Sequence, residues 1–153
     1  MGLTVDLGQY VGSWAGTNKL YLSWLPDPLR QSESELTVSL KANSQFASFE
    51  YTWAYEGKQQ EGLILLGLDK KSDAVQTVWT DSWHSSHTMV LSDGKVAEDG
   101  SISVKGYYKV EGHPDWGWRT DIIPGGETLR IVMYNVSPDG DEELAVETDF
   151  TMV

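Results

Sequence analysis

The stretch TVWTDSWHSSHTM, residues 77–89, gathers side chains that could bind a ligand or take part in a reaction. Trp79, Asp81 and Trp83 are two positions apart, which is the repeat of one face of a β-strand. Indole rings supply planar apolar contact surface, whereas a carboxylate can anchor a polar group or transfer a proton. The spacing leaves three interpretations open: the wall of a binding cavity, an active site, or a core that contains a carboxylate.

The strand expected over 74–84 has one bulkier and more apolar face, which we predict to point inward. That face reads Val75, Thr77, Trp79, Asp81 and Trp83. A carboxylate in such an interior is costly unless it is hydrogen-bonded or paired with a cation. Arg119, in WGWRTD, is the best candidate cation. Asp81 and Arg119 are then either a satisfied internal pair that fixes the fold or the polar anchor of a ligand.

Three histidines, His84, His87 and His113, are the candidates for a metal or haem site. Such a site needs its ligands to converge on one point. His84 and His87 are an odd number of positions apart, so a continuous strand would place them on opposite faces. We therefore expect exposed loop histidines, and neither a metal nor a cofactor.

The loop EGHPDWGWRTD, residues 111–121, combines strand-breaking and aromatic residues. Pro114 and Gly117 interrupt a strand, and Trp116 and Trp118 flank the glycine. One interpretation is a lid over a cavity mouth. The other is that the two tryptophans plug one end of the fold.

An enzymatic role is the alternative to a binding role. Asp81, His84, Arg119 and Asp121 could supply acid–base chemistry. No spacing typical of a Ser/His/Asp triad, a phosphate-binding loop or a metal-ligand motif occurs, however. We therefore favour a protein that is not an enzyme.

The composition restricts the partners. Lysine and arginine total 11 against 23 aspartates and glutamates, a net charge of −12, which argues against nucleic acid and anionic membranes. Cysteine is absent, so no disulfide or thiolate site can form. The start, MGLTVDLGQYVGSW, lacks a basic region followed by an apolar run, and LILLGL at 63–68 is too short to span a membrane. A cytoplasmic protein is expected.

The distribution of turn signals predicts an all-β fold. Asp-Gly and Pro-Gly turns separate segments rich in Val, Ile, Thr, Tyr and Trp, and no helical periodicity is present. With 153 residues we expect one domain over 1–153, an antiparallel up-and-down β-barrel of about ten strands preceded by a short helical turn over VDLGQYV. The strands are expected at 13–24, 34–42, 46–56, 60–69, 74–84, 86–92, 94–98, 101–111, 116–123, 127–137 and 142–152, with some neighbouring pairs forming one bent strand.

An ordered set of motifs carries a family resemblance: GSWAG at 12–16, VWTDSWH at 78–84, then WGWRTDII and MYNVSPDGDEELAVETDFTM. This order resembles a family of uncharacterised bacterial lipocalin-like domains of calycin type, similar in layout to fatty-acid-binding proteins and nitrobindins. The resemblance implies a barrel with an internal cavity, with Trp14 plugging one end. Some barrels of this type catalyse isomerisation, cyclisation or decarboxylation. Nitrobindins carry a haem-ligating histidine near the chain end, whereas the last histidine here is His113.

Together these features predict binding of a small apolar or aromatic molecule inside the barrel. A barrel filled by its own aromatic side chains would instead favour an interaction protein. The residues expected to contact the ligand are Trp53, Trp79, Asp81, Trp83 and Arg119, together with Tyr51, Tyr107 and Tyr134.

Two segments suggest self-association. LILLGL at 63–68 and LRIVMYNV at 129–136 carry apolar residues on both strand faces, although the outer face of a barrel strand is normally polar. An uncovered apolar patch marks a protein contact. We therefore predict a two-fold symmetric homodimer built on one or both of these strands. The alternative is a monomer in which loops cover them.

Overall fold

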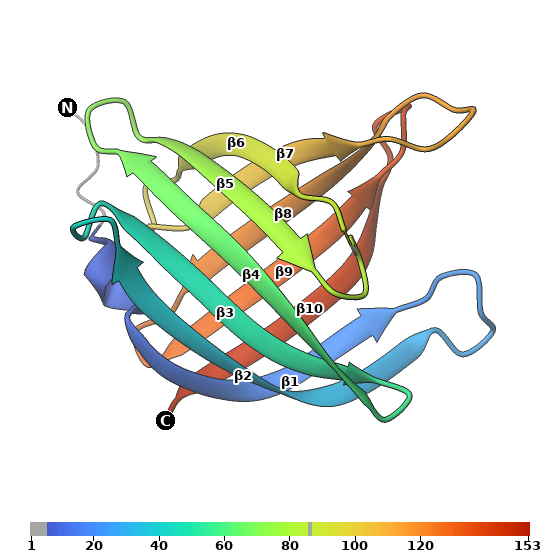
Figure 1. Ribbon diagram of the computed structural model, residues 1–153, viewed down its shortest axis with the longest axis horizontal. Helices are drawn as coiled ribbons and strands as arrows, with labels where there is room; N and C mark the ends of the chain where they lie inside the picture. The colour runs from blue at the N-terminus through green and yellow to red at the C-terminus, as the bar shows by residue number, and fades with distance from the viewer. Residues whose placement is uncertain (1–5, 86) are drawn as a thin grey trace.

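The computed structural model describes residues 6–85 and 87–153, which form a closed antiparallel β-barrel (Figure 1). Each strand pairs with its neighbours in the chain, and β1 pairs with β10 to close the ring. This confirms the predicted up-and-down barrel. The ten strands are β1 (Gly12–Tyr21), β2 (Leu29–Lys41), β3 (Phe46–Tyr55), β4 (Lys58–Asp69), β5 (Ala74–Asp81), β6 (Val90–Val96), β7 (Ile102–Tyr108), β8 (Trp116–Pro124), β9 (Thr128–Val136) and β10 (Glu142–Met152).

The strand boundaries differ most from the sequence-based ones at the start of β2, which begins at Leu29 rather than at residue 34, and around β5 and β6. The segments expected at 86–92 and 94–98 are one strand, β6, and β5 ends at Asp81 rather than at residue 84. The expected helical turn is the 3₁₀ helix η1, Leu7–Tyr10, which Asp6 caps by accepting a hydrogen bond from the Gly8 N–H. Within the described ranges, no helix is long and apolar enough to cross a lipid bilayer.

The helix η1 lies at the end of the barrel where β1 begins (Figure 1). Leu7 and Tyr10 of η1 are buried, and the Tyr10 ring packs on Phe49 with centroids 5.6 Å apart. Trp14 of β1 is buried as well, and its Nε1 donates a hydrogen bond to the Tyr10 carbonyl at 2.9 Å. Aromatic and aliphatic side chains of η1 and β1 therefore pack into this end of the interior.

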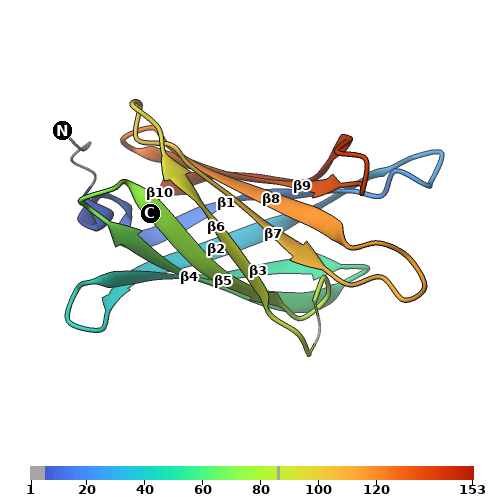
Figure 2. The same cartoon turned by 90° about the horizontal axis from the view of Figure 1, so that it is seen from above.

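The connections β1–β2, β3–β4, β5–β6, β7–β8 and β9–β10 lie at the opposite end (Figures 1 and 2). Strand alternation turns Val75, Thr77, Trp79 and Asp81 of β5 inward, and all four are buried. The predicted orientation of this strand is therefore confirmed. Residues 82–85 form the first turn after the strand, which carries Trp83 and His84 over this end of the barrel.

Candidate functional site

Asp81 is the polar centre of the loop-bearing end of the interior, with only 1% of its surface exposed. One carboxylate oxygen, Oδ2, accepts hydrogen bonds from the Tyr51 hydroxyl at 2.7 Å and from Trp53 Nε1 at 3.1 Å. The other, Oδ1, accepts from the backbone N–H groups of Trp83 at 2.9 Å and His84 at 3.0 Å. Four neutral donors therefore stabilise the carboxylate, and no ion pair among the described residues involves Asp81.

Tyr51 extends this network. Its hydroxyl accepts a hydrogen bond from Trp79 Nε1 at 2.9 Å while it donates to Asp81. Burial, reinforced by the neighbouring carboxylate, raises the pKa of Tyr51 well above its ordinary value. The ring lies across Gly62 of β4, where a Cβ atom would overlap the phenol. The absence of a side chain at Gly62 therefore gives Tyr51 the space to reach Asp81.

His84 is held among indole rings. Its imidazole centroid lies 4.8 Å from that of Trp83, 5.3 Å from Trp118, 5.5 Å from Trp53 and 5.6 Å from Trp79. Trp79 and Trp118 stack on each other at 5.0 Å. We call this group of four tryptophans the tryptophan cage.

The cage makes His84 neutral. Burial of the imidazole lowers the pKa of His84 to about 4, and the nearby Asp81 carboxylate opposes this shift without cancelling it. The expectation of an exposed loop histidine is therefore wrong for His84. The strand-face argument missed it because β5 ends at Asp81, so the turn brings His84 back over the barrel end.

Two small hollows flank His84. The inner one, about 20 Å³, is lined by apolar residues of β9 and β10 and by the buried pair in which Thr148 Oγ1 donates to Asn18 Oδ1 at 2.9 Å. The outer one, about 110 Å³, opens among the loops beside Trp83 and Trp118. Water needs roughly 10–15 Å³, so the inner hollow has space for a single water. Neither hollow is the open internal cavity that the family resemblance implies, so a ligand at this end of the barrel needs a side chain to move.

Trp118 carries an unsatisfied donor. It is 8% exposed and stacks inside the barrel, as the plug interpretation of the 111–121 loop expects. Its Nε1 is buried and has no hydrogen-bond partner among the described residues. An unpaired buried donor is destabilising, by about 1–3 kcal/mol.

The predicted contact between Asp81 and Arg119 is wrong. Arg119 lies on the outer face of β8, where it forms ion pairs with Asp121 and Glu142 and stacks over the Tyr134 ring at 4.1 Å. Tyr107 is also on the outer face, with 61% of its surface exposed. Arg119, Tyr134 and Tyr107 therefore do not line the interior, whereas the predicted Tyr51, Trp53, Trp79, Asp81 and Trp83 do come together.

The positions of these groups limit the available chemistry. Asp121 and Arg119 are outside, so Asp81 and His84 are what remains inside of the proposed acid–base set. Asp81 already accepts four hydrogen bonds. His87 and His113 are exposed, and the described residues contain no group of three histidines, aspartates or glutamates able to hold a metal. The arrangement suits hydrogen bonding and ring stacking.

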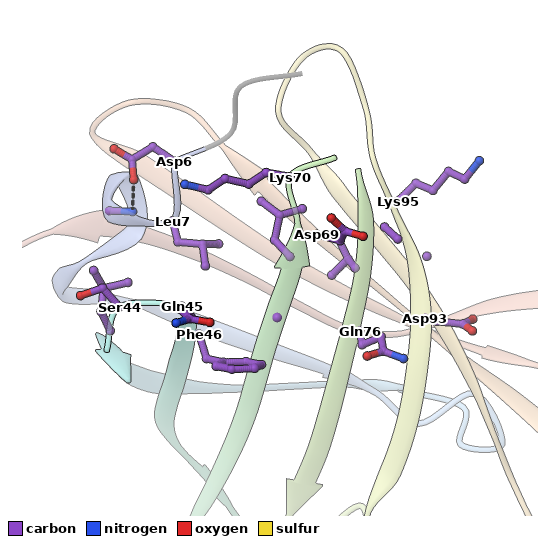
Figure 3. A pocket seen from close by; sticks show the side chains of 17 residues that line it. Asp6, Leu7, Ser44, Gln45, Phe46, Asp69, Lys70, Gln76, Asp93 and Lys95 are labelled. Carbon is purple, nitrogen blue, oxygen red and sulfur yellow. Dashed lines mark hydrogen bonds between the residues drawn. The ribbon is translucent and has the colours of Figure 1, made fainter. Parts of the chain in front are cut away.

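The largest hollow, about 1160 Å³, lies at the opposite end beside η1 (Figure 3). It is an open surface groove in which Lys70 extends toward Asp6 and Leu7. Asp69 and Asp93 share its lining with Lys70 and Lys95, so the charges are of mixed sign. The cage region is smaller, but it alone of the two combines stacked aromatic rings with an unsatisfied buried donor among the residues described.

Comparison with known proteins identifies a family and a fold. The profile of a family described as "Protein of unknown function (DUF1579)" matches residues 6–152. No curated protein matches the sequence. The solved structure of Rv2717c from M. tuberculosis is similar, with a TM-score of 0.67, 13% identity and 99% of each chain covered.

A second solved structure, the S-type phycobiliprotein lyase CPES from Guillardia theta, is also similar. Its TM-score is 0.64 at 13% identity, with 96% of this chain and 90% of that chain covered. At such low identity these two likenesses show the fold alone.

Proposed function

This chain belongs to the DUF1579 family, and we propose that it binds a small, largely apolar, aromatic ligand at the tryptophan cage. The observation that carries the proposal is the cage itself: indole rings packed around His84 beside a few directed polar groups. Ligand sites commonly combine apolar and aromatic walls with a small number of placed polar groups. A phycobiliprotein lyase has a similar barrel architecture, which supports the proposal that a barrel of this kind can bind another molecule.

The two hollows define the size of this ligand. Sites for drug-sized molecules enclose roughly 300–1,000 Å³. The hollows beside His84 measure about 20 and 110 Å³, so a ligand enters only if a side chain that lines them moves. A ligand of one or two rings therefore fits this end of the barrel, and a haem-sized molecule does not.

Tryptophan fluorescence tests the proposal, because any ring that enters the cage lies against several indoles. Titration with small aromatic compounds should change the emission saturably. Trp53→Leu should weaken that response, whereas Trp14→Leu should leave the affinity unchanged, because the buried Trp14 lies at the opposite end of the barrel, where its Nε1 donates to the Tyr10 carbonyl. A panel of one- and two-ring compounds that produces no saturable change would reject the proposal.

We propose, second, that the protein is a homodimer whose contact is the outer face of β4–β7. Leu65 pairs across the sheet with Val78, and Val78 with Leu91. Leu65, Leu91 and Tyr107 are 38%, 69% and 61% exposed, and these side chains border a surface hollow of about 520 Å³. An exposed apolar row of this kind marks a protein contact, and a second copy of the chain presents a matching row.

The other predicted contact strand is covered within one chain. Val132 and Val136 on the outer face of β9 are only 2% and 1% exposed. Val132 pairs with Asp121 on β8 and Glu147 on β10, and arginines on the same face form ion pairs with both carboxylates. The segment 129–136 therefore drops out of the predicted interface, and β4 remains.

Sedimentation at micromolar concentration tests the dimer. We expect a species of twice the 17.1 kDa chain mass, converted to monomer by Leu91→Glu. Thr17→Glu is the matched control, since Thr17 is exposed on β1 in the opposite wall. Wild-type protein that sediments as a single chain would reject the dimer.

A further inference from the structure

We propose that the imidazole of His84 occupies the place of the ligand's ring, and that the ligand is a small, uncharged heteroaromatic whose hydrogen-bond acceptor pairs with Trp118 Nε1. This inference rests on the proposed function, because it specifies the ligand class and the side chain that gives way to it. Three features of the site carry it: the ring-sized space that His84 fills, the fixed backbone beneath it and the unsatisfied indole donor.

The tryptophan cage is already a ring-binding site with a ring in it. Imidazole contacts indoles on several sides at centroid distances of 4.8–5.6 Å, within the 4.5–7 Å range of favourable aromatic pairs. Its own nitrogens are not what holds it there, since the described hydrogen bonds of His84 involve its backbone N–H. A planar ligand ring would make the same stacking contacts.

Only the His84 side chain has to move. Asp81 Oδ1 holds the backbone N–H groups of Trp83 and His84, and the Ser85 N–H donates to the Asp81 carbonyl at 3.0 Å. The turn backbone is thereby fixed, whereas rotation about the Cα–Cβ bond of His84 breaks no hydrogen bond of this turn. His84 is half-buried at the loop-bearing end, so its ring has a route into solvent.

Rotation of His84 would open one continuous chamber. Among the described residues, His84 is the one side chain that lines both the inner and the outer hollow. Without its ring the two spaces join, from the loops down to the Asn18–Thr148 pair. The chamber stays well below the roughly 300 Å³ of an ordinary ligand site, which restricts the occupant to one or two rings.

Two observations define the polarity of the occupant. Trp118 Nε1 is a buried donor without a partner, and Trp118 lines the outer hollow next to His84, so an acceptor on the ligand would satisfy it. The site offers a cation no free counter-ion, because Asp81 already accepts four hydrogen bonds from neutral donors, and burial lowers the pKa of His84 even with this carboxylate close by. A neutral ring with an acceptor therefore fits better than either a hydrocarbon or an organic cation.

Three two-ring probes test this specification on the full chain at neutral pH: quinoline, its hydrocarbon isostere naphthalene, and the cation N-methylquinolinium. For wild-type protein we expect quinoline to bind about fivefold more tightly than naphthalene, the value of one neutral hydrogen bond, and the cation to bind most weakly. His84→Ala should tighten quinoline binding by about tenfold or more, because no ring has to be displaced. His87→Ala, at an exposed position three residues on, is the matched control and should leave all three affinities unchanged.

Trp118→Phe separates the donor from the stacking surface. It keeps a ring at the position but removes Nε1, so the preference for quinoline over naphthalene should disappear while both still bind. In wild-type protein the Nε1–H resonance that Trp118→Phe eliminates should shift when quinoline binds and not when naphthalene binds. A retained preference, or an unmoved resonance, overturns the assignment of Trp118 as the donor.

The failures of the two proposals are distinguishable. If wild-type protein binds the probes but His84→Ala binds them no more tightly, His84 is not the displaced ring, and ligand binding at the cage still stands. If neither protein binds any probe, the proposed function falls together with this inference. His84→Ser, with the melting temperature of each variant recorded, provides a second small side chain in case His84→Ala does not fold.

Discussion

The two faces of the barrel wall carry carboxylates that are stabilised in different ways. On the inner face Asp81 is 1% exposed and is held by the Tyr51 hydroxyl, an indole N–H and two backbone N–H groups, with no cation. On the outer face Asp121 and Glu142 share Arg119, whose side chain is 24% exposed. On the inner face neutral donors take the place of water as hydrogen-bond partners of the carboxylate. On the outer face water and a cation stabilise the carboxylates.

The position of a carboxylate relative to the barrel wall therefore decides which kind of partner stabilises it. Trp118 and Thr120 of β8 are buried, so strand alternation places Arg119, between them, on the outside. A cation inside would have to give up its hydration, whereas hydroxyl and N–H donors are less costly to bury. We expect mutations of the inner network to be severe and those of the outer cluster to be mild.

The largest effect should come from Asp81→Ala. Loss of the carboxylate leaves the Tyr51 hydroxyl, Trp53 Nε1 and two backbone N–H groups without their acceptor in a largely dry interior. Each unsatisfied buried group costs about 1–3 kcal/mol. Because the structure relaxes partly around the lost carboxylate, we expect the free energy of unfolding to fall by about 3–5 kcal/mol in total. Urea denaturation measures it.

Asp121→Ala is the matched substitution on the outer face. It removes an ion pair with Arg119 and a hydrogen bond from Ser103 Oγ, both next to water, so we expect a loss of at most about 1 kcal/mol. Equal losses for Asp81→Ala and Asp121→Ala would break the comparison, since they would mean that burial of the carboxylate has no energetic weight.

The second effect concerns pH. The unfolded His84 side chain takes up a proton near pH 6.5, whereas in the folded protein burial lowers the pKa to about 4. Between these values the unfolded state binds the extra proton, so the free energy of unfolding falls as the pH drops from 6.5 to 4. The shift corresponds to a loss of about 2–3 kcal/mol over this window.

The pH effect is measured as a difference between wild-type protein and His84→Gln. The carboxylates titrate in both proteins and cancel, so the stability difference should change between pH 6.5 and 4 and stay flat above pH 7. His87→Gln, at an exposed position, should give no such change. A wild-type profile parallel to that of His84→Gln would show that the cage does not exclude the imidazolium.

Much of the architecture was predictable from the sequence, for identifiable reasons. Alternation in β5 and the regular turn signals are local patterns, and they gave the barrel and the inward face of Trp79 and Asp81. The position of His84 was not predictable in this way, because a turn of 82–85 abolishes the period of the strand. The aspartate itself is a local turn signal, because its carboxylate can accept hydrogen bonds from the N–H groups two and three residues further along the chain. Asp81 could therefore have indicated this turn.

The partner of Asp81 was mispredicted for a different reason. The expected partner was a cation, Arg119, although four neutral donors satisfy a carboxylate equally well. Tyr51 and Trp53 are 30 and 28 residues away from Asp81 in the chain, and only the barrel register brings them to it. Tyr107 and Tyr134 were likewise predicted inside because tyrosine is common in cores, and only the strand register shows that both face outward.

The third prediction compares the two faces of one strand, β4. Gly62→Ala on the inner face would push a methyl group into the Tyr51 ring, which cannot retreat without losing its hydrogen bonds to Asp81 and Trp79. Overpacking of this kind costs about 1–3 kcal/mol, and we expect about 2 kcal/mol. A melting curve in the near-ultraviolet would record it through the tryptophan environment.

Gly67→Ala is the matched change on the outer face of β4. There the new methyl group meets the ring of Phe46, which is 40% exposed and can swing into solvent. We expect a loss below about 0.5 kcal/mol, or a small gain from the reduced freedom of the unfolded chain. The ranking of the two alanines would be reversed only if the Tyr51 ring were as free to move as that of Phe46.

Apart from the control substitutions, the smallest effect is expected for Arg119→Ala, and its dependence on salt is what identifies it. The ion pairs of Arg119 with Asp121 and Glu142 lie on the outer face, so their loss should cost at most about 1 kcal/mol at low salt. At 1 M salt the screening length falls to about 3 Å, so the difference between wild-type protein and Arg119→Ala should shrink. The effect of Asp81→Ala should not change with salt, because its partners are buried and neutral. A salt-independent loss for Arg119→Ala would place its value in the stacking on Tyr134 and not in its charge.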